Sequence, residues 1–169
     1  ITSKNVFFDT KDGIKVNRFI EGDSLNHIKD IDYKKIAIML KKLHKGGPLT
    51  NADYLPFSRL EVFEEERKSY DKNLDNYYRV IKSLHIEKKD YLLKDKLVLS
   101  HNDFQRSNII KDLDDNYYLI DFEFMANNVD LYDVACFGND SILDGEELLK
   151  AYIEHQKEVV TRRTAFDKQ

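Results

Sequence analysis

The sequence predicts an α+β fold that is mostly helical and contains one short β-hairpin with polar side chains at its edges. Apolar residues recur every three or four positions in two segments, 32–44 and 58–81, as on the buried face of a helix. Two shorter apolar runs, Asn108–Lys111 and Tyr117–Ile120, flank the polar stretch 112–116, as in two strands joined by a turn. A length of 169 residues fits one domain.

The first elements expected are two short strands, Val6–Phe8 and Ile14–Ile20. Asp12-Gly13 lies between them and is typical of a tight hairpin turn. An amphipathic helix is then expected from about Asp32 to His44, because apolar side chains share one face and Gly46-Gly47-Pro48 ends the periodic pattern. That face carries Tyr33, Ile36, Leu40 and Leu43.

A long helix is expected to begin near Ser58, with the charged run 64–68 on its solvent side. Its apolar positions are Leu60, Phe63, Tyr70, Leu74, Tyr77 and Ile81. The strand Leu97–Leu99 then leads into the polar loop before the hairpin. Two helices, Leu131–Phe137 and Gly145–Val160, complete the predicted fold.

The composition is typical of a globular domain, with 41% hydrophobic and 34% charged residues. The net charge of −4 and the interspersed basic residues indicate no nucleic-acid partner. Cys136 is the single cysteine and lies in an apolar stretch, so we expect a buried, inert thiol and an intracellular, cytoplasmic protein. No apolar run is long enough for membrane insertion.

Three oxygen-bearing side chains mark the edges of the predicted hairpin. Asp103 precedes Asn108 by five residues, and Asp121 follows the second strand. Mg²⁺ prefers carboxylate and amide oxygens, which Asn108 and Asp121 offer as metal ligands. Asp103 has the position of a base that orients a hydroxyl and accepts its proton during phosphoryl transfer from Mg-ATP. Each residue type alone is common in turns, but the hairpin would bring Asn108 and Asp121 together, and the set of three favours a catalytic site.

This pattern resembles a known family. His101-x-Asp103, Asn108 and a later strand that ends in Asp121 are arranged as in the choline and ethanolamine kinases, which belong to the aminoglycoside-phosphotransferase group with a protein-kinase-like fold. The pairing of His101-Asn102-Asp103 with Asp121-Phe122-Glu123-Phe124 is similar to the choline-kinase branch. Antibiotic kinases more often have glycine in place of Asn102.

The resemblance covers most of residues 14–139. Arg18–Gly22 resembles the hinge between the two lobes, Leu40–His44 a family helix that ends in Leu-His, and Asp130–Ala135 an element beneath the catalytic loop. It implies ATP and Mg²⁺ as cofactors and choline, ethanolamine or a similar amino alcohol as the substrate. The residues that it implies around the adenine are Phe19, Ile20, Ile110 and Ile120.

The sequence departs from the family pattern at its beginning. No glycine-rich phosphate loop precedes the hinge, and no strand lysine has a partner glutamate on a helix. We therefore expect residues 1–22 to be the last strands of an amino-terminal lobe with the hinge, residues 23–169 to be the carboxy-terminal catalytic lobe, and most of the first lobe to be absent. On this interpretation the chain alone has little turnover and a longer product is active, because positioning of the triphosphate needs the missing parts.

Four further residues are candidates for contact with the substrate or for support of the loop. His101 is expected to be a buried brace rather than a base. Asp133 is interpreted as a helix cap and loop brace. Glu123, two residues beyond Asp121 in a strand, would point to the same side and reach metal-bound water, substrate or backbone. Tyr132, like Phe124 and Phe137, fits either the core or a cage for a quaternary ammonium group.

Two alternatives remain open at this point. One is an aminoglycoside-type phosphotransferase, which has the same catalytic residues and a different acceptor. The other is a catalytically silent kinase-like binding module. The sequence carries no signal for an oligomeric state.

Overall fold

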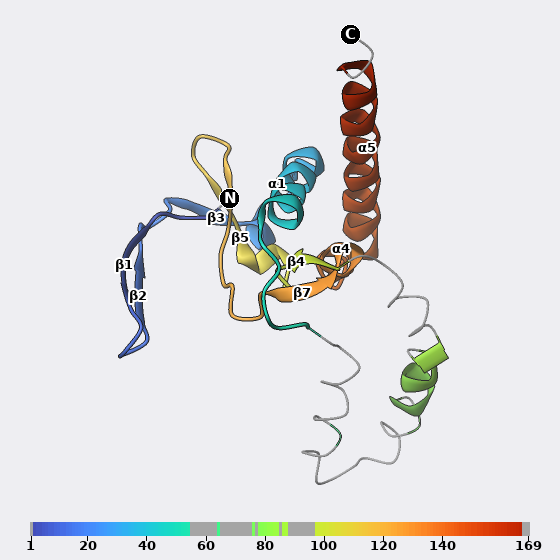
Figure 1. Ribbon diagram of the computed structural model, residues 1–169, viewed down its shortest axis with the longest axis horizontal. Coiled ribbons are helices and arrows are strands. Elements are labelled where there is room, and N and C mark those ends of the chain that lie inside the picture. The colour runs from blue at the N-terminus through green and yellow to red at the C-terminus, as the bar shows by residue number, and fades with distance from the viewer. Residues whose placement is uncertain are drawn as a thin grey trace.

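The computed structural model describes residues 2–54, 64, 76, 78–84, 86–87 and 97–166, with side chains through residue 155. Helices lie beside small antiparallel sheets (Figure 1), and the predicted α+β class is confirmed. Most of the long helix expected from Ser58 lies outside the described residues, although residues 78–84 are helical. None of the helices in the described part of the chain combines the length and apolar character that a bilayer crossing requires.

The first sheet is a hairpin of β1 (Asn5–Asp9) and β2 (Ile14–Asn17), which projects away from the helices in Figure 1. Gly13 in the turn has φ 68°, a left-handed conformation that glycine adopts without strain. The second strand ends at Asn17, three residues before the predicted end. The apolar side chains of this hairpin, among them Phe7 and Phe8, are 47–66% exposed.

The second sheet has the order β3 (Gly22–Ser24), β5 (Ile109–Asp112), β6 (Tyr117–Leu119). The predicted β5–β6 hairpin is confirmed, with Ile109 opposite Leu119. The strand β3 was not predicted, because three small or polar residues carry no strand pattern. A Cβ on Gly22 would lie 2.2 Å from the Lys111 carbonyl oxygen, so glycine permits this pairing. The domain boundary predicted after residue 22 falls within β3 and stays a prediction.

The third sheet pairs β4 (Leu97–Ser100) with β7 (Ala126–Val129). The strand β7 was not predicted, because Asn127 and Asn128 are polar. Both are nevertheless buried. The Asn127 side chain is satisfied by the backbone of Thr50 and by the carboxylate of Asp53. Long-range partners therefore make a buried strand from a polar sequence.

The helices pack against these sheets. α1 (Tyr33–Gly46) begins at Asp32, whose side chain accepts from the Lys35 N–H, and it buries the predicted apolar face. α4 (Asp130–Phe137) lies beside β4 and β7, and α5 (Ile142–Phe166) runs alongside α1 (Figure 1). The Tyr33 hydroxyl donates to Asp144 over 2.6 Å and so joins α1 to α5. The fully buried side chains of the core include Leu25, Ile36, Leu40, Phe104, Ile109, Leu119, Phe137 and Leu148.

Candidate active site

The predicted base and one predicted metal ligand are in direct contact. The Asn108 amide nitrogen donates to Asp103 Oδ2 over 2.8 Å and to the Asp103 carbonyl over 2.9 Å. Both partners are acceptors, so the nitrogen of the amide faces them. The amide oxygen, Oδ1, accepts only a long bond of 3.5 Å from the Ser107 hydroxyl and has a further lone pair for another ligand. Gln105 donates to the other carboxylate oxygen of Asp103. The 3₁₀ turn η2 (Arg106–Asn108) closes the loop and returns Asn108 toward Asp103.

The hairpin brings Asp121 next to this pair through the backbone. The N–H of Ile120 donates to the carbonyl of Asn108 over 3.0 Å, and Asp121 follows directly with φ 61°. Its side chain is exposed and lines an open cleft of about 890 Å³. Among the described residues no group of three or more His, Cys, Asp or Glu side chains could hold a metal. The proposed ligand set does not depend on such a group, because it consists of one carboxylate, from Asp121, and one amide oxygen, from Asn108; Mg²⁺ takes few protein ligands and completes its shell with phosphate and water.

The strand argument for Glu123 is wrong. β6 ends at Leu119, and Glu123 lies in a turn closed by the Met125 N–H and the Phe122 carbonyl at 3.1 Å. The left-handed residue Asp121 breaks the strand, so alternation no longer applies. Glu123 is exposed and lines the same cleft as Asp121. The turn, rather than strand alternation, places it there.

The four residues proposed around the adenine are not gathered in one cavity. Phe19 and Ile20 line a cavity of about 440 Å³ beside the β5–β6 turn. Ile120 lines the larger cleft, together with Lys15 and Lys42. Ile110 is half-buried in β5 opposite Tyr118 and lines neither. Thr2 and Ser3 line both cavities, which therefore adjoin.

His101 supports the loop. It is fully buried, and its Nε2 lies 2.9 Å from the carbonyl oxygen of Ile120, to which it donates. Its ring packs against Phe122 at 5.0 Å and Phe104 at 6.3 Å. Nδ1 has no hydrogen-bond partner within the described residues. The ring thus ties the loop to the residue before Asp121, as expected of a brace.

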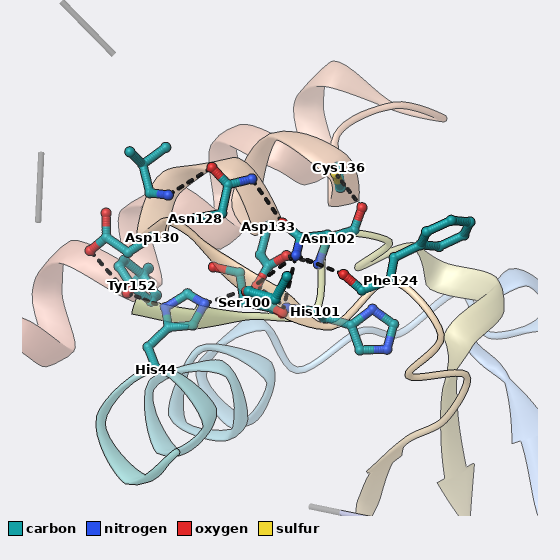
Figure 2. A network of polar contacts seen from close by, with 12 residues as sticks. His44, Ser100, His101, Asn102, Phe124, Asn128, Asp130, Asp133, Cys136 and Tyr152 are labelled. Carbon is teal, nitrogen blue, oxygen red and sulfur yellow. Dashed lines mark hydrogen bonds and ion pairs between the residues drawn. The ribbon is translucent and has the colours of Figure 1, made fainter. Parts of the chain in front are cut away.

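Asp133 holds the backbone of the same loop (Figure 2). Its two oxygens accept from the N–H groups of His101 and Asn102 over 2.9 and 2.8 Å. The residue is fully buried in α4. Its predicted role as a helix cap is wrong, because Val129 occupies the N-cap position. The loop-bracing part of the prediction agrees with these contacts.

Asn102 gives the loop its sharp turn. Its φ is 65°, a conformation that asparagine tolerates better than most residues. The buried side chain donates to the Phe124 carbonyl over 2.8 Å and accepts from Asn128 over 2.8 Å (Figure 2). The side chain that marked the choline-kinase branch in the sequence therefore joins the loop to the turn 122–125 and to β7.

The aromatic candidates divide into two groups. Phe137 is 1% exposed and packs against Phe104 and Tyr33 in the core, so it contributes nothing to a cage. Tyr132 is half-buried, with its ring centroid 5.5 Å from that of Tyr54. Tyr54 was not predicted, since it lies in a segment without periodicity and is joined to β7 by the hydrogen bond from its N–H to the Asn127 carbonyl.

Three more residues support the site and were not predicted. Arg106 donates to the carbonyls of Leu25 and Ile28 and pairs with Asp144 at 2.8 Å, which ties the loop to α5. His44 in α1 contacts Asp133, and Tyr152 in α5 contacts His44. The Leu-His ending of the predicted helix was the only sequence signal for His44, and it did not indicate that His44 contacts Asp133.

Comparisons with known proteins agree with this geometry. The family described as choline/ethanolamine kinase matches residues 7–166. The choline kinase LicA from Streptococcus pneumoniae is 27% identical, with a TM-score of 0.73 over 89% of this chain and 56% of that one. A second LicA structure, 26% identical, holds AMP. No curated protein matches the sequence significantly.

More distant structures confirm the kinase-like fold. The ethanolamine kinase from Plasmodium vivax has 23% identity and a TM-score of 0.64 over 91% of this chain and 53% of its own. The ADP-bound aminoglycoside phosphotransferase APH(2'')-Ib has 20% identity and a TM-score of 0.61 over 96% of this chain and 63% of its own. The chain thus spans about half the length of the choline and ethanolamine kinases that it matches.

Proposed function

The chain belongs to the choline/ethanolamine kinase family, and on this basis we propose that the whole protein transfers the terminal phosphoryl group of ATP to the hydroxyl of choline or a related amino alcohol. The observation that carries the proposal is the hydrogen bond between the side chains of Asp103 and Asn108. The N–H of Ile120 donates to the carbonyl of Asn108, and Asp121 is the residue after Ile120. Base and metal ligands are then neighbours, as in-line transfer requires.

Asp103 is the base in this proposal. As the substrate oxygen forms its bond to the terminal phosphorus, the bond from phosphorus to the ADP oxygen breaks and the hydroxyl proton passes to the Asp103 carboxylate. The hydrogen bonds from Asn108 and Gln105 orient that carboxylate before substrate binds. Asn108 Oδ1 and Asp121 hold Mg²⁺, which neutralises charge on the phosphates when bound.

The nucleotide is proposed to lie along the cleft that contains Ile120, with its adenine toward the adjoining cavity of Phe19 and Ile20; Ile110, which lines neither cavity, is no longer part of the proposed adenine site. Two observations support this: the AMP held by LicA and the lysines of the cleft beside Asp121. Lys15 and Lys42 carry positive charge that suits phosphate groups.

A cationic amino alcohol is the proposed acceptor. Glu123 in the cleft supplies negative charge, and the pair Tyr54 and Tyr132 offers aromatic faces that attract quaternary ammonium groups. This makes choline and ethanolamine better candidates than a neutral alcohol.

The test is an acceptor panel of choline, ethanolamine, kanamycin and glycerol with ATP and Mg²⁺, read by ³¹P NMR for the phosphorylated product. It is run on the 169-residue chain and on any longer natural form. We expect phosphocholine or phosphoethanolamine as the product. The Asp103→Asn variant should have a kcat about 10²–10⁴-fold lower than that of the wild type. Asp140→Asn is the matched control, because Asp140 is exposed in the turn before α5 and lines neither cavity.

Product from kanamycin alone would replace this proposal with the aminoglycoside alternative. Nucleotide binding without any product, in every form of the protein, would establish a binding module instead. Full activity in Asp103→Asn would remove the proposed base. Robust choline-dependent ADP formation by the 169 residues alone would contradict the expectation that a further lobe is needed.

A further inference from the structure

A buried histidine in α1 contacts the residue that holds the catalytic loop. His44 is 6% exposed and lies in the last turns of the helix. Its Nε2 lies 2.9 Å from Asp133 Oδ2, and its Nδ1 lies 2.7 Å from the hydroxyl of Tyr152 (Figure 2). One ring therefore joins α1, α4 and α5 beneath the loop.

The same carboxylate oxygen serves the histidine and the loop. Asp133 Oδ2 accepts both from His44 and from the N–H of His101, while Oδ1 accepts from the N–H of Asn102. Without the donor from His44, the carboxylate could turn about its χ2 angle and lose its alignment with these two amides. The next residue along the chain is Asp103.

The orientation of the imidazole is itself fixed. Asp133 can only accept, so Nε2 carries a hydrogen, and the Tyr152 hydroxyl holds the opposite nitrogen. That hydroxyl also lies 3.2 Å from Asp130 Oδ2. The Tyr152 ring stands edge-on to the imidazole with centroids 5.8 Å apart, and Lys41 Nζ lies 3.6 Å from the centroid of the Tyr152 ring. His44 is thus held at both of its ring nitrogens and by the ring of Tyr152.

We propose that His44 is a positioning residue for phosphoryl transfer: held by Tyr152, it fixes the Asp133 carboxylate, which fixes the His101 and Asn102 amides and so the place of Asp103. The kinetic consequence rests on the proposed function, whereas the structural coupling does not. Within the described residues, the side-chain hydrogen bonds of His44 go to Asp133 and Tyr152, not to the proposed metal ligands or the proposed base.

The coupling is tested first without turnover, by amide hydrogen exchange followed by NMR. In His44→Asn, whose shorter side chain does not reach Asp133, we expect the His101 and Asn102 amides to exchange at least about tenfold faster. The Leu40 and Leu148 amides, in the core of α1 and α5, should keep their protection. His27→Asn is the matched control, because His27 is exposed in the 3₁₀ turn η1 (Leu25–His27).

Unchanged exchange at both loop amides would overturn the coupling, and an equal increase at all four amides would reduce His44 to a structural residue. Should His44→Asn fail to fold, Tyr152→Phe keeps the packed ring and removes only the hydroxyl that holds Nδ1. It should accelerate the same two amides.

The kinetic test is rescue. His44→Asn should lower kcat about ten- to a hundredfold, with the KM values for ATP and acceptor nearly unchanged, because a displaced base slows the chemical step rather than binding. His44→Gln, whose amide nitrogen can donate as Nε2 does, should recover most of that loss. No difference between the Gln and Asn variants would overturn the positioning role. These kinetics are measured on a form of the protein that shows turnover. Absence of turnover in every natural form of the wild type would count against the proposed function and leave the exchange result standing.

Discussion

The Asn108 side-chain nitrogen donates to the Asp103 carboxylate over 2.8 Å, so one amide can serve the proposed base with its nitrogen and a cation with its oxygen. Asn108 follows Asp103 by five positions, and the turn η2 supplies the reversal that lets them meet. The spacing in the sequence is therefore compatible with a direct contact between the two side chains.

Replacement of Asn108 should weaken metal binding and stability together. In Asn108→Ala the cation loses a ligand and Asp103 loses a buried donor. We expect the dissociation constant for Mn²⁺ in the presence of ADP, measured by electron paramagnetic resonance, to rise at least about tenfold. The free energy of unfolding should fall by about 1–3 kcal/mol. Asn139→Ala, at an exposed turn position, is the control and should change neither. Unaltered Mn²⁺ affinity would exclude Asn108 as a ligand.

Asn102 should tolerate glycine better than alanine. Both substitutions remove the buried amide and its bonds to Phe124 and Asn128. Alanine also has to adopt φ near 65°, which costs about 1–2 kcal/mol more than for glycine. Urea denaturation should therefore rank the free energies of unfolding as wild type, Asn102→Gly, Asn102→Ala. A glycine variant that is less stable than the alanine variant would show that the backbone conformation is not the constraint.

Local pattern predicted the elements whose cause is local. Helix α1 followed from apolar spacing and the Gly46-Gly47-Pro48 stop, and the β5–β6 hairpin followed from two apolar runs around a polar turn. The spacing of Asp103 and Asn108 is local in the same sense, because both lie in one segment of six residues, but their direct contact was not predicted. The position of Asp121 relative to Asn108 depends, in addition, only on the register of the β5–β6 hairpin.

Long-range partners determine what the sequence did not predict. The strand β7 is buried although two of its residues are asparagines, because Asn127 finds partners 74 and 77 residues away. His44 and Asp133 are 89 residues apart, and nothing in either local sequence indicates their contact. Glu123 was misjudged because strand alternation was extended past Leu119, where the left-handed Asp121 ends it.

Two glycines in helices should respond to alanine with opposite signs. A Cβ on Gly145 in α5 would lie 2.8 Å from the Cα of Gly138, so Gly145→Ala should force α4 and α5 apart and lower the free energy of unfolding by about 1–3 kcal/mol. Gly46 in the last turn of α1 has nothing within 4 Å of an added Cβ. There Gly46→Ala should raise stability by up to about 1 kcal/mol through helix propensity. Thermal unfolding followed by circular dichroism separates the two, and a stabilised Gly145→Ala would refute the close packing.

Cys136 should resist thiol reagents in the native protein. Burial, followed by the nearby charge of Asp133, raises the pKa of its thiol from 9.0 to about 12. Because the thiolate is the reactive form, about a thousandfold less of it exists at pH 8 than in the unfolded chain. Iodoacetamide labelling followed by mass spectrometry should therefore be slow in buffer and fast in urea. Equal rates would show that the thiol is accessible.

The same raised pKa makes part of the stability pH-dependent. Below pH 9 the thiol is protonated in the folded and unfolded states, so its contribution is constant. Between pH 9 and about 12 the unfolded chain releases this proton and the folded chain does not, so the contribution is lost as the pH rises. Tyr33 and Tyr152 act in the same direction, because burial raises the pKa of each above 10.0. Cys136→Ala isolates the thiol: its urea midpoint should fall less than that of the wild type between pH 8 and pH 10.5, and an equal fall in both would assign the alkaline loss to the tyrosines.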